Sequence, residues 1–361
     1  MHVMLMHARY RPGHQVSPAW HFPASVCAIQ HSDNSWTATY TPAGDTNLAR
    51  GDALIAACAA AVSGDTLYLG NSICDIQAGA SPCAAIVTGV NMQGVGIASY
   101  VLTTQASREM FYAEGTSTIS NMKFSNNGTS ASEALLQKKA GGDISGTLTL
   151  NSVTVAEMPT PTSPLAALWV NTAAYNCVIN NCNIGGIRLG GTATISGSSI
   201  YGDSGRCIFL GTTSSKLVAT DSAFTHTGAG NRNTIDVNNA IPVASGFAVS
   251  ATRCTINLDA GTGAAVLNGA NAAARKIELV DCIITGSATN GVRSSNAIAT
   301  NNVFVIGTSI AGTFTNGLNL NTNVATVTTV NDAAYTYNGG VHAASTYSTT
   351  TGTGTLTLVH D

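Results

Sequence analysis

Charged side chains are scarce in this sequence, and their scarcity excludes several classes of protein. Only 9% of residues are Asp, Glu, Lys or Arg, the formal net charge is −3, and the fifteen basic residues form no run. Nucleic acid and anionic membranes are bound chiefly through clustered positive charge, so neither is an expected partner. Disordered chains carry more charge and fewer aliphatic residues. A chain that is 44% hydrophobic is therefore expected to bury a core.

Long apolar and helix-forming runs are also missing. No stretch is apolar for long enough to span a bilayer, and no apolar segment follows the early basic residues, so a secretion signal is not recognisable. We interpret residues 1–44 as an N-terminal arm. It lacks the compact spacing of a metal site despite five histidines: His2, His7, His14, His21 and His31. Neither a metal nor another cofactor is indicated.

The cysteine count leaves the redox state open. Nine cysteines is an odd number, so at least one thiol is expected to be free. Cys74 and Cys83 bracket a short loop of small residues and Pro, and these two could be bridged. Pairing among Cys27, Cys58, Cys74 and Cys83 is not determined by their spacing.

What the chain does contain is a repeated phrase, in which Asn or Asp is followed three residues later by Ile, Val or Phe. Apolar residues alternate before the Asn or Asp, as at Leu217 and Ala219, and alternate again with shifted phase after it. Such a shift would turn a flat strand inside out unless the chain bends sharply at that residue. Copies of the phrase begin at Asn121, Ser152, Asn181, Gly197, Asp221, Arg253, Asp281 and Asn301.

The repeat predicts an all-β fold, a right-handed single-stranded parallel β-helix with three strands per turn. A third strand precedes each phrase as a triplet whose outer residues are apolar, for example Ile187-Arg188-Leu189. Asn and Asp should line one corner, with Cys182, Cys254 and Cys282 facing inward beside it as small hydrophobic residues. An amphipathic helix over 47–62 is expected to cap the N-terminal end of a solenoid spanning 45–306. Residues 307–361 form a Thr/Asn/Gly-rich segment suited to β structure and assembly.

Three stretches carry a resemblance to a known superfamily: the helix Leu54–Val62, then SGDTLYLG at Ser63–Gly70, and VNMQGVGIASYVLTT at Val90–Thr104. With the Asn/Asp corner and inward cysteines, they resemble the pectate-lyase-like superfamily of right-handed β-helices over roughly residues 45–310. The resemblance implies the fold but not one function, because that superfamily includes polysaccharide lyases, hydrolases, epimerases, adhesins and phage tailspikes.

The middle residues of the triplets give the best candidate site, a row of side chains facing out from one sheet. Aromatic faces stack on sugar rings, and Arg and Asp bond hydroxyl or carboxylate groups, so the row indicates glycan binding. Val266 also falls in this row by its triplet. The candidate glycan-binding residues are Trp169, Arg188, Phe209, Asp236 and Arg293 on the row, with Arg206 in a nearby loop.

Catalysis has weaker support. The family's clustered acidic calcium ligands and paired aspartates have no counterpart here, so the catalytic residues stay unknown. A lyase would use Arg188 or His226 as base and Arg206 or Arg232 to neutralise charge, whereas a hydrolase would use Asp203 and Asp236. At the corner, Asp221, Arg253 and Asp281 should form a surface ion-pair ladder. Thr-rich segments such as 324–330 and 353–358 would suit an ice-binding surface, because flat arrays of Thr can order water. Thr is also a common strand residue, so these segments do not by themselves indicate that function.

The sequence therefore predicts a β-helical protein that presents a surface to a polysaccharide or cell-surface glycan. Our leading hypothesis is a phage-type virion structural or receptor-binding protein of the tailspike kind, because the fold meets polysaccharides outside the cell while no export signal is recognisable. Such a protein would be a homo-oligomer, with a trimer as one option, and would contact other virion proteins. The alternative is a secreted polysaccharide lyase or glycoside hydrolase.

Overall fold

A computed structural model describes most of the chain between residues 27 and 358. Outside the description lie 1–26, 37–39, 41, 78–81, 107–108, 129–132, 139–144, 157–165, 203–206, 229–231, 241–245, 270–274, 295–300, 312, 315, 321–323, 331–334, 338–339, 343–354 and 359–361. From residue 315 onward, only the backbone is described. Arg206, Asp203 and the histidines of residues 1–26 therefore lie outside the described residues.

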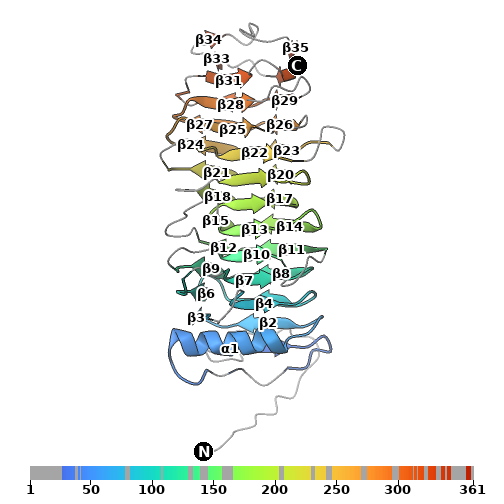
Figure 1. Ribbon diagram of the computed structural model, residues 1–361, viewed down its shortest axis with the longest axis vertical. Helices are drawn as coiled ribbons and strands as arrows, with labels where there is room; N and C mark the ends of the chain where they lie inside the picture. Colours follow the sequence, from blue (N-terminus) through green and yellow to red (C-terminus); the bar gives the residue numbers. More distant parts are fainter. Residues whose placement is uncertain are drawn as a thin grey trace, which may run out of the picture.

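The described strands form three long sheets that stack around one interior (Figure 1). Sheet A runs β1 (Cys27–Gln30), β2 (Thr66–Leu69), β5 (Asn91–Gln93), β8 (Ser117–Ser120), β11 (Gly146–Asn151), β14 (Tyr175–Asn180), β17 (Thr192–Ser196), β20 (Lys216–Thr220), β23 (Val249–Thr252), β26 (Lys276–Val280), β29 (Asn301–Ile306), β32 (Val324–Val330) and β35 (Thr355–Leu358).

Sheet B follows sheet A along the chain, and sheet C follows sheet B. Sheet B runs β3 (Ser72–Asp75), β6 (Ser99–Thr103), β9 (Lys123–Asn126), β12 (Thr154–Val155), β15 (Asn183–Ile184), β18 (Ser199–Gly202), β21 (Ala223–His226), β24 (Thr255–Leu258), β27 (Ile283–Gly286) and β30 (Ser309–Ile310). Sheet C runs β4 (Ala84–Ile86), β7 (Phe111–Ala113), β10 (Leu135–Gln137), β13 (Leu168–Val170), β16 (Ile187–Leu189), β19 (Ile208–Gly211), β22 (Ile235–Asn239), β25 (Ala264–Asn268), β28 (Asn290–Ser294) and β31 (Asn316–Leu320). A separate hairpin pairs β33 (Tyr335–Tyr337) with β34 (Gly340–His342).

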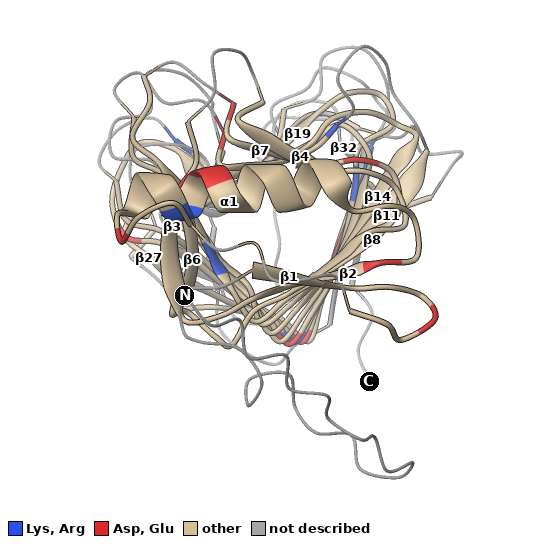
Figure 2. Ribbon diagram, turned by 90° about the horizontal axis from the view of Figure 1, so that it is seen from below, with Lys and Arg blue, Asp and Glu red and all other residues tan. Residues whose placement is uncertain are grey.

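This arrangement is a parallel β-solenoid with three strands per turn, as predicted. From β2 to β29, each strand pairs in parallel with the strand three positions later, as β14 does with β17. Seen from the N-terminal end in Figure 2, the chain passes from sheet C to sheet A to sheet B clockwise while receding, which makes the solenoid right-handed. Parallel pairing runs from β2 to β35, so the turns extend beyond residue 306, the expected C-terminal limit of the solenoid.

The copy of the phrase predicted at Asn301 is wrong: Asn301 and Phe304 lie on β29, where Val303 and Val305 are the buried residues, and the corner of that turn is Gly307. The corner between sheets A and B otherwise confirms the predicted register. Its first residue has a φ near +50° on successive turns, the left-handed conformation that a sharp bend needs: Asn121, Ser152, Asn181, Gly197, Asp221, Arg253, Asp281 and Gly307. Asn181 and Asp281 are exposed. The bend turns the chain by one sheet and lets the apolar alternation restart on the inside.

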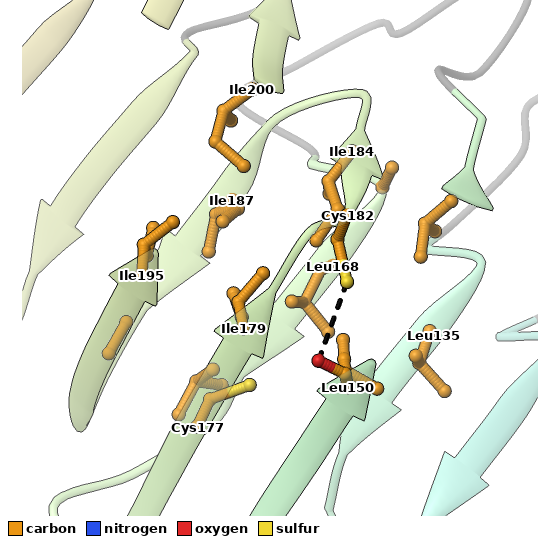
Figure 3. Packing of buried hydrophobic residues seen from close by; sticks show 14 of the residues in the cluster. Leu135, Leu150, Leu168, Cys177, Ile179, Cys182, Ile184, Ile187, Ile195 and Ile200 are labelled. Carbon is orange, nitrogen blue, oxygen red and sulfur yellow. Dashed lines mark hydrogen bonds between the residues drawn. The ribbon is translucent and has the colours of Figure 1, made fainter. Parts of the chain in front are cut away.

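From Cys182 onward, the next residue along the corner forms a ladder of hydroxyl and thiol groups inside the solenoid, whereas the two preceding turns place Met122 and Val153 there. Cys182, Cys254 and Cys282 are 4%, 1% and 1% exposed, which confirms their predicted burial. The Cys182 sulfur lies 3.2 Å from the Asn180 carbonyl and 3.5 Å from that of Leu150, the second contact being drawn in Figure 3. Ser198, one turn later, bonds in the same way: its hydroxyl donates to the Ser196 carbonyl at 2.8 Å and accepts from the Cys182 N–H at 3.0 Å.

A helix closes the N-terminal end of the core. The helix α1 (Asn47–Ala60) begins at Thr46, whose hydroxyl accepts a hydrogen bond from the Ala49 N–H at 3.1 Å. Leu54, Ala57 and Cys58 of α1 are buried against the first turn, which covers apolar side chains that would otherwise meet water. A Cβ at Gly51 would stand 1.9 Å from the Asp75 carbonyl oxygen, so this close approach requires glycine. No described helix is long and apolar enough to cross a membrane.

The cysteines near this end correct one prediction. Cys74 and Cys83 are both free and buried, and so are Cys27 and Cys58. Cys74 lies on β3, beside the Ser72 hydroxyl at 3.7 Å, whereas the Cys83 thiol donates to Gln105 at 3.7 Å. The loop between Cys74 and Cys83 connects two different sheets, so short spacing along the sequence does not bring the two sulfurs together as a disulfide.

Candidate functional site

The predicted row of side chains on sheet C is continuous in the structure. Trp169 pairs with Arg188, Arg188 with Phe209, and Phe209 with Asp236, so the four stand on adjacent turns. We call the whole set the outward row of sheet C: Tyr112, Leu136, Trp169, Arg188, Phe209, Asp236, Leu267 and Arg293.

One predicted member of this row is wrong. Val266 was expected to face outward, but it pairs with Ile235 and Val292, faces the interior and is fully buried. Leu267 takes the outward position instead. The run Ala264–Leu267 is apolar at every position, so the alternation that set the other triplets carries no information there.

Sheet C is the sheet with connections of variable length along both of its edges. From β8 to β30, each connection from sheet A to sheet B has two residues, as at 121–122 and 253–254. Connections on the two edges of sheet C vary widely, from 185–186 to 156–167 on one edge and from 190–191 to 240–248 on the other. Variable loops around a rigid sheet are the usual location of binding residues.

Trp169 lies among cations. The Arg188 guanidinium carbon is 4.5 Å from the centroid of the indole ring, and the Lys138 nitrogen is 5.5 Å from it. Both distances are within the range of cation–π attraction. The side of the ring that Arg188 covers is therefore not an open platform for a sugar, and the indole instead fixes the position of the guanidinium.

Lys138 belongs to a second group of side chains, one turn toward the N-terminus. Its ammonium nitrogen is 3.3 Å from the Glu109 carboxylate and 5.5 Å from the centroid of the Tyr112 ring. The Tyr112 hydroxyl donates a hydrogen bond to the same carboxylate. Burial and this carboxylate raise the pKa of the Tyr112 phenol. The positive charge of Lys138 is thus balanced by the carboxylate of Glu109.

Glu133 is the most unusual carboxyl group near the row. It lies one turn above Glu109, because the Met110 N–H bonds the Glu133 carbonyl at 3.3 Å. Glu133 is only 2% exposed, and its Oε1 has no hydrogen-bond partner among the described residues. Desolvation raises the pKa of this carboxyl, while Arg188 and Lys138 oppose the rise less strongly.

The C-terminal part of the row, from Phe209 to Arg293, is partly covered by other residues. Asp236 is 3% exposed although it faces outward, and it accepts a hydrogen bond from the Asn233 amide at 3.2 Å. Phe209 is half-buried and leans over Gly211, where a Cβ would stand 2.8 Å from the ring. The described part of the chain offers no hydrogen-bond partner to the buried Nε of Arg293.

One further predicted residue, His226, does not reach the row. His226 pairs with Gly202 and Leu258 at an inward position of sheet B and is fully buried, so it is a core residue and cannot act as a base on sheet C. Arg232 is half-buried on the connection that leads into β22. At the corner, the structure shows one pair of the predicted ladder of Asp221, Arg253 and Asp281: the Arg253 guanidinium donates to both Asp221 oxygens at 2.7 Å and lowers the pKa of that carboxyl.

Sequence reasoning missed Glu109, Tyr112, Glu133 and Lys138. They belong to early turns whose corner phrases are weak, so the triplet strands there were not aligned. A signal was present, because Phe111-Tyr112-Ala113 and Leu135-Leu136-Gln137 continue the series of triplets toward the N-terminus. Glu109 lies shortly before the first of these two triplets, and Glu133 lies shortly before the second.

Comparison with known proteins finds no family model, no curated protein and no solved structure that matches the chain significantly.

Proposed function

We propose that this protein binds a polysaccharide or cell-surface glycan along the outward row of sheet C. The observation that carries the proposal is the coincidence of this row with the one sheet bordered by variable connections on both edges. Elsewhere the outward residues of the early and middle turns are mostly small and uncharged, such as Thr149, Val178 and Thr194 on sheet A.

Within this proposal, the chain is a surface-presenting member of the pectate-lyase-like superfamily of the tailspike type. It would act outside the cell or on a virion, as a homo-oligomer in contact with other virion proteins. Its fold supports this role, because a solenoid offers a long rigid face whose core is independent of the loops beside it. Sedimentation equilibrium tests the oligomer, and a monomer at micromolar concentration would contradict that part of the proposal.

Glycan binding is tested on the row itself. We expect the native protein to bind at least one member of a bacterial glycan array, and Phe209→Ala to weaken that binding. Val218→Ala, which removes a side chain from the outward face of sheet A, is the matched control and should bind normally. An array without hits, or equal loss in both variants, would overturn the proposal.

A second candidate function is favoured by Glu109 and Glu133. Two carboxyl groups on adjacent turns, one with its pKa raised by burial, are the kind of groups that a glycoside hydrolase uses. Release of reducing ends from a bound glycan, lost in Glu133→Gln, would establish this activity. New unsaturated ends, followed by their absorbance, would instead indicate a lyase, and we expect none.

A further inference from the structure

The ladder of hydroxyl and thiol groups inside the A–B corner places two thiols on consecutive turns. From Cys182 onward, its members in order are Cys182, Ser198, Ser222, Cys254, Cys282 and Thr308. Cys182 is followed one turn later by a hydroxyl, whereas Cys254 is followed by a second thiol. A disulfide requires two sulfurs, so among these positions only Cys254 and Cys282 can be joined across neighbouring turns.

The backbones of these two turns are already in contact at the corner. The Ile283 N–H donates a hydrogen bond to the Cys254 carbonyl at 2.9 Å. The strands that begin one residue after the two cysteines, β24 and β27, pair in register with Thr255 opposite Ile283. Neighbouring strands lie about 4.8 Å apart, within the roughly 4.4–6.8 Å between Cα atoms that a disulfide spans.

The two sulfurs lie against the same stretch of backbone. The Cys254 sulfur is 3.4 Å from the Thr252 carbonyl oxygen, and the Cys282 sulfur is 3.4 Å from the carbonyl oxygen of Ala251, the preceding residue. The Cys282 side chain therefore reaches onto the turn of Cys254, where the two thiols are hydrogen-bonded to each other. A bond between them can follow from rotation of these side chains, because the turns are already paired.

The surroundings of Cys254 favour its reaction with an oxidant. The hydrogen bond from Cys282 lowers the pKa of the Cys254 thiol, and the thiolate is the form that reacts. Both cysteines are buried, yet the residues that directly precede them, Arg253 and Asp281, are exposed. The thiols thus lie immediately inside the corner, which favours a small oxidant such as hydrogen peroxide over a bulky disulfide.

We propose that Cys254 and Cys282 are an oxidative cross-linking site, at which a peroxide closes a disulfide between two consecutive turns of the solenoid. The Cys254 sulfur attacks one peroxide oxygen, the O–O bond breaks, and a sulfenic acid and one water result. The Cys282 sulfur then attacks the Cys254 sulfur, the S–O bond breaks, and a second water leaves. Two thiols are oxidised and one peroxide is reduced.

The bond would reinforce the solenoid where it joins the turns. A solenoid is held together mainly by contacts between adjacent turns, and a covalent link between two of them restricts the unfolded chain. We therefore expect the oxidised protein to unfold at a higher urea concentration than the reduced protein. This consequence does not depend on glycan binding.

Peptide mapping of the full native chain tests the site directly. The reduced protein is treated with hydrogen peroxide, the peroxide is removed with catalase, and the remaining thiols are alkylated in urea. Trypsin cuts after Arg253, Arg275 and Arg293, so the two cysteines fall on separate peptides. We expect these peptides to be joined, with the loss of two hydrogen atoms, and to separate on treatment with dithiothreitol.

Cys182 is the matched control within the same molecule, because it occupies the same corner with a hydroxyl as its neighbour. It should remain outside any disulfide. The proposal is overturned if Cys254 and Cys282 stay open to alkylation, are oxidised only to sulfinic or sulfonic acids, or are linked to other cysteines. It is also overturned if the link forms without raising the urea midpoint.

Two variants then locate the effect. Cys282→Ser keeps a hydrogen-bonding group in the ladder, as Thr308 does one turn later, and should abolish both the link and the peroxide-dependent rise in midpoint. A rise that persists in this variant would contradict the assignment. Ser198→Cys gives Cys182 a neighbouring thiol and should create a second link, and its absence in the folded variant would refute the geometric argument. The native peptide map decides the matter even where a variant does not fold.

Discussion

Replacing cysteine by serine at two neighbouring buried sites should have very different effects on stability. Cys182 and Cys177 are both fully enclosed on the same turn and both face the interior in Figure 3. At position 182, a hydroxyl would find the Val153 N–H, now 3.4 Å from the sulfur, as a donor and the Asn180 carbonyl as an acceptor. At position 177, no described group bonds the sulfur, and burial raises the pKa of the thiol.

The difference can be estimated from these contacts. An unpaired buried hydroxyl costs about 1–3 kcal/mol, so Cys177→Ser should lower the free energy of unfolding by roughly that amount. Cys182→Ser should cost less than about 1 kcal/mol, because Ser198 already fills the same place one turn later with both bonds made. Loss of the sulfur itself is common to both variants and cancels in the comparison.

Urea unfolding followed by far-ultraviolet circular dichroism measures both variants against the native protein. The midpoints are compared at equal m-values, since a change in m would signal altered cooperativity in a repeat fold. Equal destabilisation by the two substitutions would refute the reasoning that the corner ladder accepts hydroxyl and thiol groups interchangeably.

Four other outcomes are expected. Thiol reagents should label Cys182, Cys254 and Cys282 slowly in the native protein and rapidly in urea, and fast native labelling would contradict their burial. Glu133→Gln should raise the melting temperature at neutral pH. The pKa of Glu133 is raised in the folded protein, so stability that is present below about pH 4.5 is lost as pH rises through that pKa. If the melting temperatures of the variant and the native protein changed with pH in parallel, this expectation would be wrong. Gly197→Ala should cost about 1 kcal/mol, because its φ of +55° is strained for alanine, and an unchanged urea midpoint would speak against that conformation. Trp169→Ala should weaken glycan binding while the melting temperature changes little, and retained affinity would exclude a part for Trp169 in the site.

The fold was predictable because the corner leaves a local signal. From Asn121 to Gly307, a polar or glycine residue with positive φ, one inward residue and then an apolar anchor recur with the same geometry, so Asn181 and Asp281 fix the register without knowledge of distant contacts. Where side chains are apolar on both faces, as at Val266 and Leu267, the local signal vanishes. Register is then decided by pairing with β22 and β28.

The candidate site was only partly predictable. Trp169, Arg188 and Phe209 could be placed on adjacent turns because each is the middle residue of a clear triplet. The cation–π contact between Arg188 and Trp169 and the burial of Glu133 depend on groups from several turns, which no sequence spacing specifies. His226 was misplaced because a strand near its end gives too few residues to establish which face they occupy.

The contrast between the fixed A–B corner and the variable edges of sheet C has a consequence for how such a chain can change. An insertion at the corner would shift every later strand by one face, and the core would be lost. An insertion beside sheet C lengthens a loop at an entropic cost that grows only slowly with length. New ligand preferences can therefore be grafted onto the scaffold by exchanging these loops, one turn at a time, while the folding information in the corners stays untouched.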